Sequence, residues 1–244
     1  MTLLKNVSML QGGILANSIN TVIFDLDGTL VDSQPAALGA SIQALSRLGV
    51  QVTEADLREV FGGGARKLLN YFLERDLGET HAAQVLEDAI NIRADLQLEL
   101  TGKVELLPNV KELLNLLKDN KFKLAMATMS SCAVVDSVLG HHGLNGYFDA
   151  VLTIDDVTQG KPDPEILVKV VDRLGSQVNQ SLYVGDSGHD LEASVRLGMP
   201  FLLVDSELYV RGDARHKLRL EAEQNGFPIV APAELTSIYE IASA

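Results

Sequence analysis

One stretch of this chain decides its fold: Thr21-Val22-Ile23-Phe24-Asp25-Leu26-Asp27-Gly28-Thr29-Leu30. A short apolar run, typical of a buried strand, ends in two carboxylates one residue apart and then a glycine turn. Residues i and i+2 of a strand point to the same side, so Asp25 and Asp27 would lean over the crevice where open α/β sheets bind ligands. Such close like charges are relieved by a cation, a shared proton or separate roles, which favours a metal or acid/base site over a plain acidic turn.

The composition is that of an ordinary globular protein with one large or two smaller domains. The 244 residues are 46% hydrophobic and 22% charged. A formal net charge of −13 without a basic cluster argues against a nucleic-acid partner. The single cysteine, Cys132, excludes an internal disulfide, fits a reducing compartment and is expected to be buried or half-buried. Because no run is long and apolar enough for a membrane span or a signal peptide, we expect a cytoplasmic protein without a membrane partner.

Further apolar runs, each four to seven residues long, alternate with segments of helical spacing. The runs cover residues 122–128, 150–153, 181–185 and 201–204, and helical patterns cover 110–117, 134–139 and 166–174. This alternation predicts the α/β class, with a Rossmann-like parallel sheet core wrapped by helices.

One interval departs from the alternation. Between about residues 35 and 100 the chain has amphipathic helical patterns and no strand-like run. Ser33 with Pro35 marks a helix start there, and Gly49 marks its end. We therefore expect residues 34–103 to form an inserted α-helical cap, residues 21–33 and 104–244 to form the catalytic core, and residues 1–20 to be an N-terminal extension.

Two residues are suited to bind a phosphate group: one ends the second apolar run, and the other lies in the loop after the third. Thr128 precedes residues 129–131, and its hydroxyl together with the free N–H groups of a helix start would cradle an anion. Lys161 is presented by the loop 160–164, which two prolines stiffen, and a cation fixed there can neutralise a phosphoryl group. The alternatives are an ordinary helix N-cap for Thr128 and a solvated loop lysine.

The fourth run is followed by a second acidic turn, Gly185-Asp186-Ser187-Gly188-His189-Asp190. Carboxylate oxygens are the ligands that Mg²⁺ takes in proteins. Asp186 and Asp190 are therefore candidate ligands, and an acidic helix cap is the alternative.

The order of these motifs on successive strands resembles that of the haloacid dehalogenase superfamily of phosphohydrolases. The match spans about residues 21–204, and residues 24–33 with 62–66 most resemble its phosphoglycolate phosphatase group. The motifs in chain order are Asp25-x-Asp27-Gly28-Thr29, Thr128, Lys161 and Gly185-Asp186-x-x-x-Asp190.

The resemblance implies a role for each of these residues, and general chemistry agrees. Asp25 would be the nucleophile that forms an aspartyl-phosphate, and Asp27 would be the acid/base group that protonates the leaving alkoxide and then deprotonates water. The remaining implied roles are Mg²⁺ coordination by Asp25, the Asp27 carbonyl and Asp186, orientation by Asp190, and phosphate binding by Thr128 and Lys161.

The expected cap contains a candidate for recognition of the leaving group. The glycine run ending at Gly64, followed by Arg66, would offer backbone N–H groups and a guanidinium for a substrate carboxylate, and a flexible turn with a solvated arginine is the alternative. Two features depart from the resemblance: Met129 stands where many relatives have Asn, so its contacts would be lost or supplied by Ser130 or Ser131, and residues 207–227 form a longer segment than expected.

We therefore predict a phosphatase acting on a small phosphorylated metabolite, as a monomer or homodimer. The alternatives are a phosphoglucomutase-like phosphoryl transferase with the same core residues, and a phospho-accepting signalling module whose acceptor would follow the third run, at 155–156. A dehalogenase is disfavoured because a halide leaving group needs no acid such as Asp27. A dinucleotide-binding dehydrogenase is disfavoured because the first turn is acidic rather than glycine-rich.

Overall fold

The computed structural model describes residues 18–60, 64–208 and 210–244, so most of the expected N-terminal extension lies outside the described residues. The chain divides into two compact units. One unit is formed by the chain up to Asp32 together with Leu106–Ala244, and the other by Ser33–Glu105. Among the described residues, no helix combines the length and the apolar character needed to cross a membrane.

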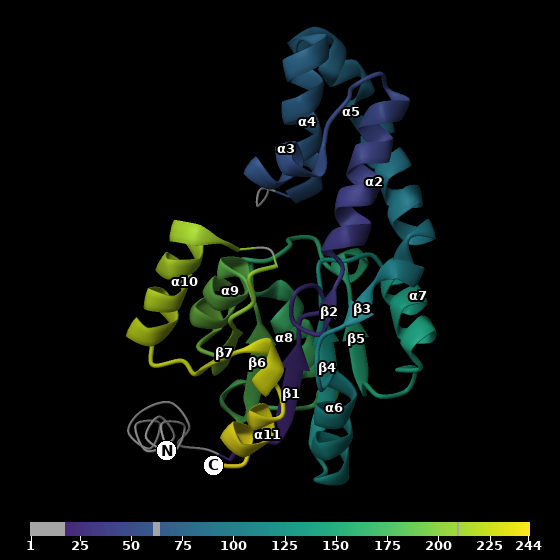
Figure 1. Cartoon of the computed structure of the whole chain (residues 1–244). Coiled ribbons are helices and arrows are strands. Elements are labelled where there is room, and N and C mark those ends of the chain that lie inside the picture. Colours follow the sequence, from purple (N-terminus) through teal and green to yellow (C-terminus); the bar gives the residue numbers. More distant parts are fainter. Residues whose placement is uncertain (1–17, 61–63, 209) are drawn as a thin grey trace. The chain divides into compact units, whose positions relative to one another are not determined.

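The larger unit is built on a parallel sheet of six strands, which confirms the predicted α/β class (Figure 1). In sheet order the strands are β5 (Ala150–Leu152), β4 (Lys123–Ala127), β1 (Thr21–Phe24), β6 (Ser181–Gly185), β7 (Phe201–Val204) and β8 (Ile229–Val230). The strands β1, β6 and β7 have the predicted bounds. The strand β4 begins one residue later and ends one residue earlier than its apolar run, β5 ends one residue earlier, and β8 is too short for a sequence pattern to reveal.

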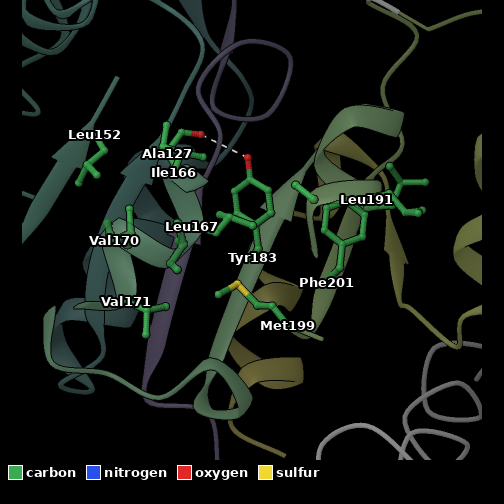
Figure 2. Close-up of a cluster of buried hydrophobic side chains, with 14 of the residues drawn as sticks. Ala127, Leu152, Ile166, Leu167, Val170, Val171, Tyr183, Leu191, Met199 and Phe201 are labelled. Atoms are coloured by element: carbon green, nitrogen blue, oxygen red, sulfur yellow. Dashed lines mark hydrogen bonds between the residues drawn. The ribbon is translucent and has the colours of Figure 1, made fainter. Parts of the chain in front are cut away.

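Helices cover the sheet, and alternate residues of each strand face different sides of it. Tyr183 and Phe201 form one apolar cluster with side chains of α8 and α9 (Figure 2). Ile23 of β1 and two residues of α10 belong to the same cluster. On the other face of the sheet, α6 contacts β4, and α11 contacts α6. The helices are α6 (Val110–Asp119), α7 (Cys132–His142), α8 (Glu165–Leu174), α9 (Gly188–Leu197), α10 (Gly212–Gln224) and α11 (Ser237–Ala242), with short 3₁₀ turns η3 (Ile154–Asp156), η4 (Val178–Gln180) and η5 (Pro232–Glu234).

The smaller unit is helical and has a core of its own. Buried leucines at 38, 45, 69 and 73 pack with Phe72, as expected for amphipathic helices whose apolar stripes meet. Its elements are α2 (Gln34–Arg47), α3 (Glu54–Glu59), α4 (Gly64–Leu77), α5 (Glu79–Glu99) and the 3₁₀ turn η2 (Thr101–Lys103). The chain passes between the units at β2 (Val31–Asp32) and β3 (Glu105–Leu106), which pair as a two-stranded sheet.

One sequence expectation about the larger unit is wrong. Cys132 was expected to be buried or half-buried, and it is exposed. It is the first residue of α7, ahead of the stripe of Val135, Val138 and Leu139 that the core buries. Position at the helix start, rather than the apolar character of the side chain, decides its exposure.

Candidate active site

Strand β1 lies at the point where the strand order reverses. The chain continues from β1 to β4 and β5 on one side and to β6, β7 and β8 on the other, which is the arrangement that opens a crevice at the carboxyl ends of the central strands. Phe24 pairs with Met126 of β4 and Val184 of β6. The N–H of Asp25 donates to the Val184 carbonyl at 2.9 Å, so this carboxylate emerges between the ends of both neighbouring strands.

The turn after β1 gives the two carboxylates different surroundings. Gly28 has a φ of 80°, a value that glycine adopts readily, and its N–H donates to the Val31 carbonyl at 2.8 Å. The Asp25 side chain is buried beside a lysine, whereas Asp27 is half-buried and accepts a hydrogen bond of 2.6 Å from the Ser130 hydroxyl. The pair therefore has the asymmetry that separate chemical roles require.

Lys161 is the positive centre of the cluster. Its Nζ lies 2.7 Å from Oδ1 of Asp25 and 2.7 Å from Oδ1 of Asp190, although it comes from the loop that precedes α8. The lysine side chain is only 4% exposed. Burial lowers the pKa of this ammonium, but the Asp190 and Asp25 carboxylates outweigh burial and raise it above its ordinary value. Lys161 is therefore a buried, charged group, and the solvated loop lysine is the wrong alternative.

Three buried carboxylates surround that one ammonium. Each of Asp25, Asp186 and Asp190 offers an oxygen within 4.8 Å of the oxygens of the other two. Burial, together with the neighbouring carboxylates, raises the pKa of Asp25 to about 7 despite Lys161, and raises the pKa of Asp186 well above its usual value. The Oδ2 atom of Asp186 is buried and has no hydrogen-bond partner among the described residues. These features fit a divalent cation, because three acids share one lysine and one carboxyl oxygen has no hydrogen-bond partner.

Asp190 is held in place from both sides. Its Oδ2 accepts hydrogen bonds from the Ser187 N–H at 3.1 Å and from the Ser187 hydroxyl at 2.6 Å, as in a helix capping box. Burial raises the pKa of Asp190, but Lys161, Ser187 and Tyr183 outweigh it and the net shift is downward. Gly185 permits this approach, since a Cβ there would lie 2.6 Å from the Asp190 Cβ and Cγ. The capping alternative is therefore correct for Asp190, and a role of this carboxylate in metal binding stays a prediction.

Tyr183 belongs to the cluster and sequence reasoning missed it. Its hydroxyl lies 2.7 Å from Oδ1 of Asp190, 2.8 Å from Nζ of Lys161 and 3.2 Å from the Ala127 carbonyl (Figure 2). Burial and Asp190 raise the pKa of the phenol well above its usual value, so it stays a neutral donor. The available signal was a tyrosine inside a buried strand, whose hydroxyl needs a partner.

Thr128 and Met129 directly follow β4, which ends at Ala127. Thr128 is fully buried, and its Oγ1 accepts a hydrogen bond of 3.1 Å from the Ser130 N–H. The N-cap of α7 is Ser131, so the N-cap alternative for Thr128 is wrong. Met129 binds the lysine loop: its Sδ accepts the Lys161 N–H at 3.0 Å, and a Cβ on Gly160 would lie 3.0 Å from that sulfur.

The cap candidates lie in the smaller unit. Gly64 is the first residue of α4, while Gly62 and Gly63 lie outside the described residues. Arg66 forms a bidentate ion pair with Glu87 of α5, with N–O distances of 2.7 and 3.0 Å. Both side chains are largely exposed, at 61% and 67%. A role for Arg66 and Gly64 in substrate binding stays a prediction.

Comparisons with known proteins show the family of this chain. A family model described as haloacid dehalogenase-like hydrolase matches residues 22–204. The phosphoglycolate phosphatase of Vibrio vulnificus is 34% identical over 184 residues, which cover 74% of this chain and 81% of the relative.

Two solved structures extend the likeness in fold. A predicted phosphoglycolate phosphatase from Haemophilus somnus has a TM-score of 0.74 at 23% identity, over 91% of this chain and 99% of its own. A Thermotoga maritima protein with a provisional β-phosphoglucomutase name has a TM-score of 0.72 at 26% identity, over the same shares of the two chains.

Proposed function

Because the chain belongs to the haloacid dehalogenase-like hydrolases, we propose that it is a Mg²⁺-dependent phosphatase for a small phosphate monoester, such as phosphoglycolate or a sugar phosphate. The observation that carries the proposal is the buried cluster in which Asp25, Asp186 and Asp190 surround Lys161. Burying three acids with one lysine is costly for folding, and such perturbed groups concentrate at functional sites.

In the proposed reaction Asp25 is the nucleophile. One of its oxygens forms a bond to phosphorus while the bond from phosphorus to the leaving oxygen breaks. Asp27 gives its proton to that leaving oxygen, so the product departs as an alcohol. Asp27 then takes a proton from the water that attacks the aspartyl-phosphate, and inorganic phosphate leaves with Asp25 regenerated.

The cation site supports this role of Asp25. Asp25, Asp186 and the backbone carbonyl of Asp27 would hold Mg²⁺, with Asp190 orienting its surroundings. When bound, the cation would neutralise charge on the phosphoryl oxygens and on the carboxylates. Lys161 and Thr128 would bind the phosphoryl oxygens, so that most of the rate enhancement comes from positioning and electrostatics.

The helical unit is proposed as the cap that recognises the leaving group. Its insertion directly after the acidic turn supports this, because the inserted chain begins six residues after Asp27. Arg66 is its candidate for a substrate carboxylate. The exposed ion pair with Glu87 costs little to exchange for another carboxylate.

A phosphoglucomutase-like transferase is the second candidate, favoured by the Thermotoga maritima neighbour at 26% identity. It would pass the phosphoryl group from Asp25 to a sugar instead of to water. The signalling alternative is weaker, because the carboxylates of its candidate acceptors after β5 already accept backbone hydrogen bonds. The Asp155 carboxylate accepts one from the N–H of Cys132, and the Asp156 carboxylate accepts one from the N–H of Thr153.

A panel of phosphorylated metabolites, assayed for phosphate release with Mg²⁺ and with EDTA, tests the proposal. We expect release from at least one small monoester, its loss in EDTA and its recovery when Mg²⁺ is restored. Turnover of β-glucose 1-phosphate without phosphate release would favour the transferase. No turnover of any ester would contradict both enzymes.

A further inference from the structure

The acid/base candidate Asp27 is bound by a residue that none of the expected roles includes. The Ser130 hydroxyl donates to Oδ2 of Asp27 over 2.6 Å, across 103 positions of sequence. An O–H donor and a carboxyl oxygen at this distance make a short hydrogen bond within the normal O–H···O range. The contact therefore joins the turn after β1 to the end of β4.

The backbone segments that carry the two partners of this contact are each fixed by a hydrogen bond from a backbone N–H group. The Ser130 N–H donates to Oγ1 of Thr128 at 3.1 Å, which sets the direction of the segment that carries the hydroxyl. On the other side, Gly28 donates to Val31 at 2.8 Å, which closes the turn that carries Asp27. Because the backbone is constrained at both Ser130 and Asp27, the hydroxyl fixes the position of one oxygen of the Asp27 carboxyl group.

We propose that Ser130 is a positioning residue for the acid/base step: its hydroxyl holds Oδ2 of Asp27 and so orients the carboxyl group that exchanges the proton with the leaving group and then with water. This inference rests on the proposed phosphatase function. Ser130 binds the acid, while the sulfur of the adjacent Met129 binds the lysine loop at 3.0 Å.

The test compares two leaving groups in the Ser130→Ala variant. An alkyl phosphate such as phosphoglycolate needs a proton on its leaving oxygen, whereas p-nitrophenolate leaves without one. We expect kcat for the alkyl ester to fall about 10-fold or more and kcat for p-nitrophenyl phosphate to change by less than about twofold. The KM of both esters and competitive inhibition by inorganic phosphate should be unchanged, because the phosphate contacts are elsewhere.

Two further variants separate positioning from general damage. Cys132→Ala is the nearby control, since Cys132 is exposed at the first position of α7 and has no role in the proposed reaction, so this variant should keep both activities. Ser130→Thr retains a hydroxyl and should recover much of the alkyl ester activity. Equal losses for both esters in Ser130→Ala, or no loss for either, would overturn the role of Ser130. If the wild-type protein cleaves no phosphate ester at all, that result contradicts the proposed phosphatase function itself, and with it the role of Ser130.

Discussion

Two ion pairs in this molecule have the same N–O distance but differ in burial and in the number of acids nearby. Lys161 of the larger unit lies 2.7 Å from Asp25, and Arg66 of the helical unit lies 2.7 Å from Glu87. The lysine is 4% exposed and faces three buried acids, whereas the arginine is 61% exposed and faces one exposed acid.

The difference teaches that burial, not distance, determines what an ion pair does. An exposed pair gains little because water and salt screen it and because two long side chains lose freedom. A buried group with unbalanced charge is costly for folding and is retained for chemistry. The predictions below test this contrast, beginning with the largest expected effect.

Asp25→Asn should abolish catalysis while the protein keeps its stability. We expect phosphate release to fall at least about 10³-fold, because an amide cannot form the acyl phosphate. The melting temperature should stay equal or rise, since one of three mutually repelling buried acids is removed. Asp172→Asn, at an exposed position of α8, is the control and should retain activity. An active Asp25→Asn enzyme would refute the assignment of the nucleophile.

Lys161→Met should destabilise the protein strongly, because Asp25, Asp186 and Asp190 then have no buried counter-charge. We expect a loss of about 3 kcal/mol in the free energy of unfolding in metal-free buffer, measured by urea denaturation. Lys161→Arg should have low phosphatase activity, since the forked guanidinium of arginine does not fit the buried site that holds the compact lysine ammonium. A loss as small as that of an exposed pair would remove the contrast between the two regions.

The pH dependence of stability should run opposite to that of an ordinary salt bridge. Burial raises the pKa of Asp25 from 3.8 to about 7, so in this window the folded protein keeps a proton that the unfolded chain has lost. The free energy of unfolding of the metal-free protein should therefore fall as the pH rises through that window. Asp190 acts the other way, because its pKa is lowered and its stabilising contribution is lost only at lower pH.

Urea denaturation in EDTA at about pH 5 and about pH 8 measures this dependence, and Mg²⁺ should reverse it because a cation favours the ionised carboxylates. The Asp25→Asn variant should show a flatter profile than the wild type. A metal-free protein that gains stability between these two pH values would contradict the raised pKa.

Arg66→Ala should have the smallest effect on stability, within about 0.5 kcal/mol, because its partner Glu87 is solvated. If the arginine binds a substrate carboxylate, KM for phosphoglycolate should rise about 10-fold while KM for an alkyl phosphate without a carboxylate stays the same. Arg75→Ala, another exposed arginine of α4 that pairs with Asp76, is the matched control. Unchanged kinetics in Arg66→Ala would remove the arginine from the substrate site.

Much of the larger unit could be predicted from local pattern. The runs that became β1, β6 and β7 have the predicted bounds, because a buried parallel strand is a short apolar run that glycine and acidic turns delimit. The two-residue strand β8 and the N-cap at Ser131 were missed or misplaced, because such short elements have too few residues for a periodic signal. Cys132 was expected inside, since residue type says nothing of position within a helix.

The sequence by itself determined the chemistry of the cluster: carboxylates and a lysine placed after successive strands must meet, because parallel strands bring their carboxyl ends to one edge. Only the tertiary structure decided the partners. It placed Lys161 between Asp25 and Asp190, put the Tyr183 hydroxyl beside them, and bound Asp27 to Ser130 across 103 residues. Such contacts depend on strand order and register, which no local pattern of residues contains.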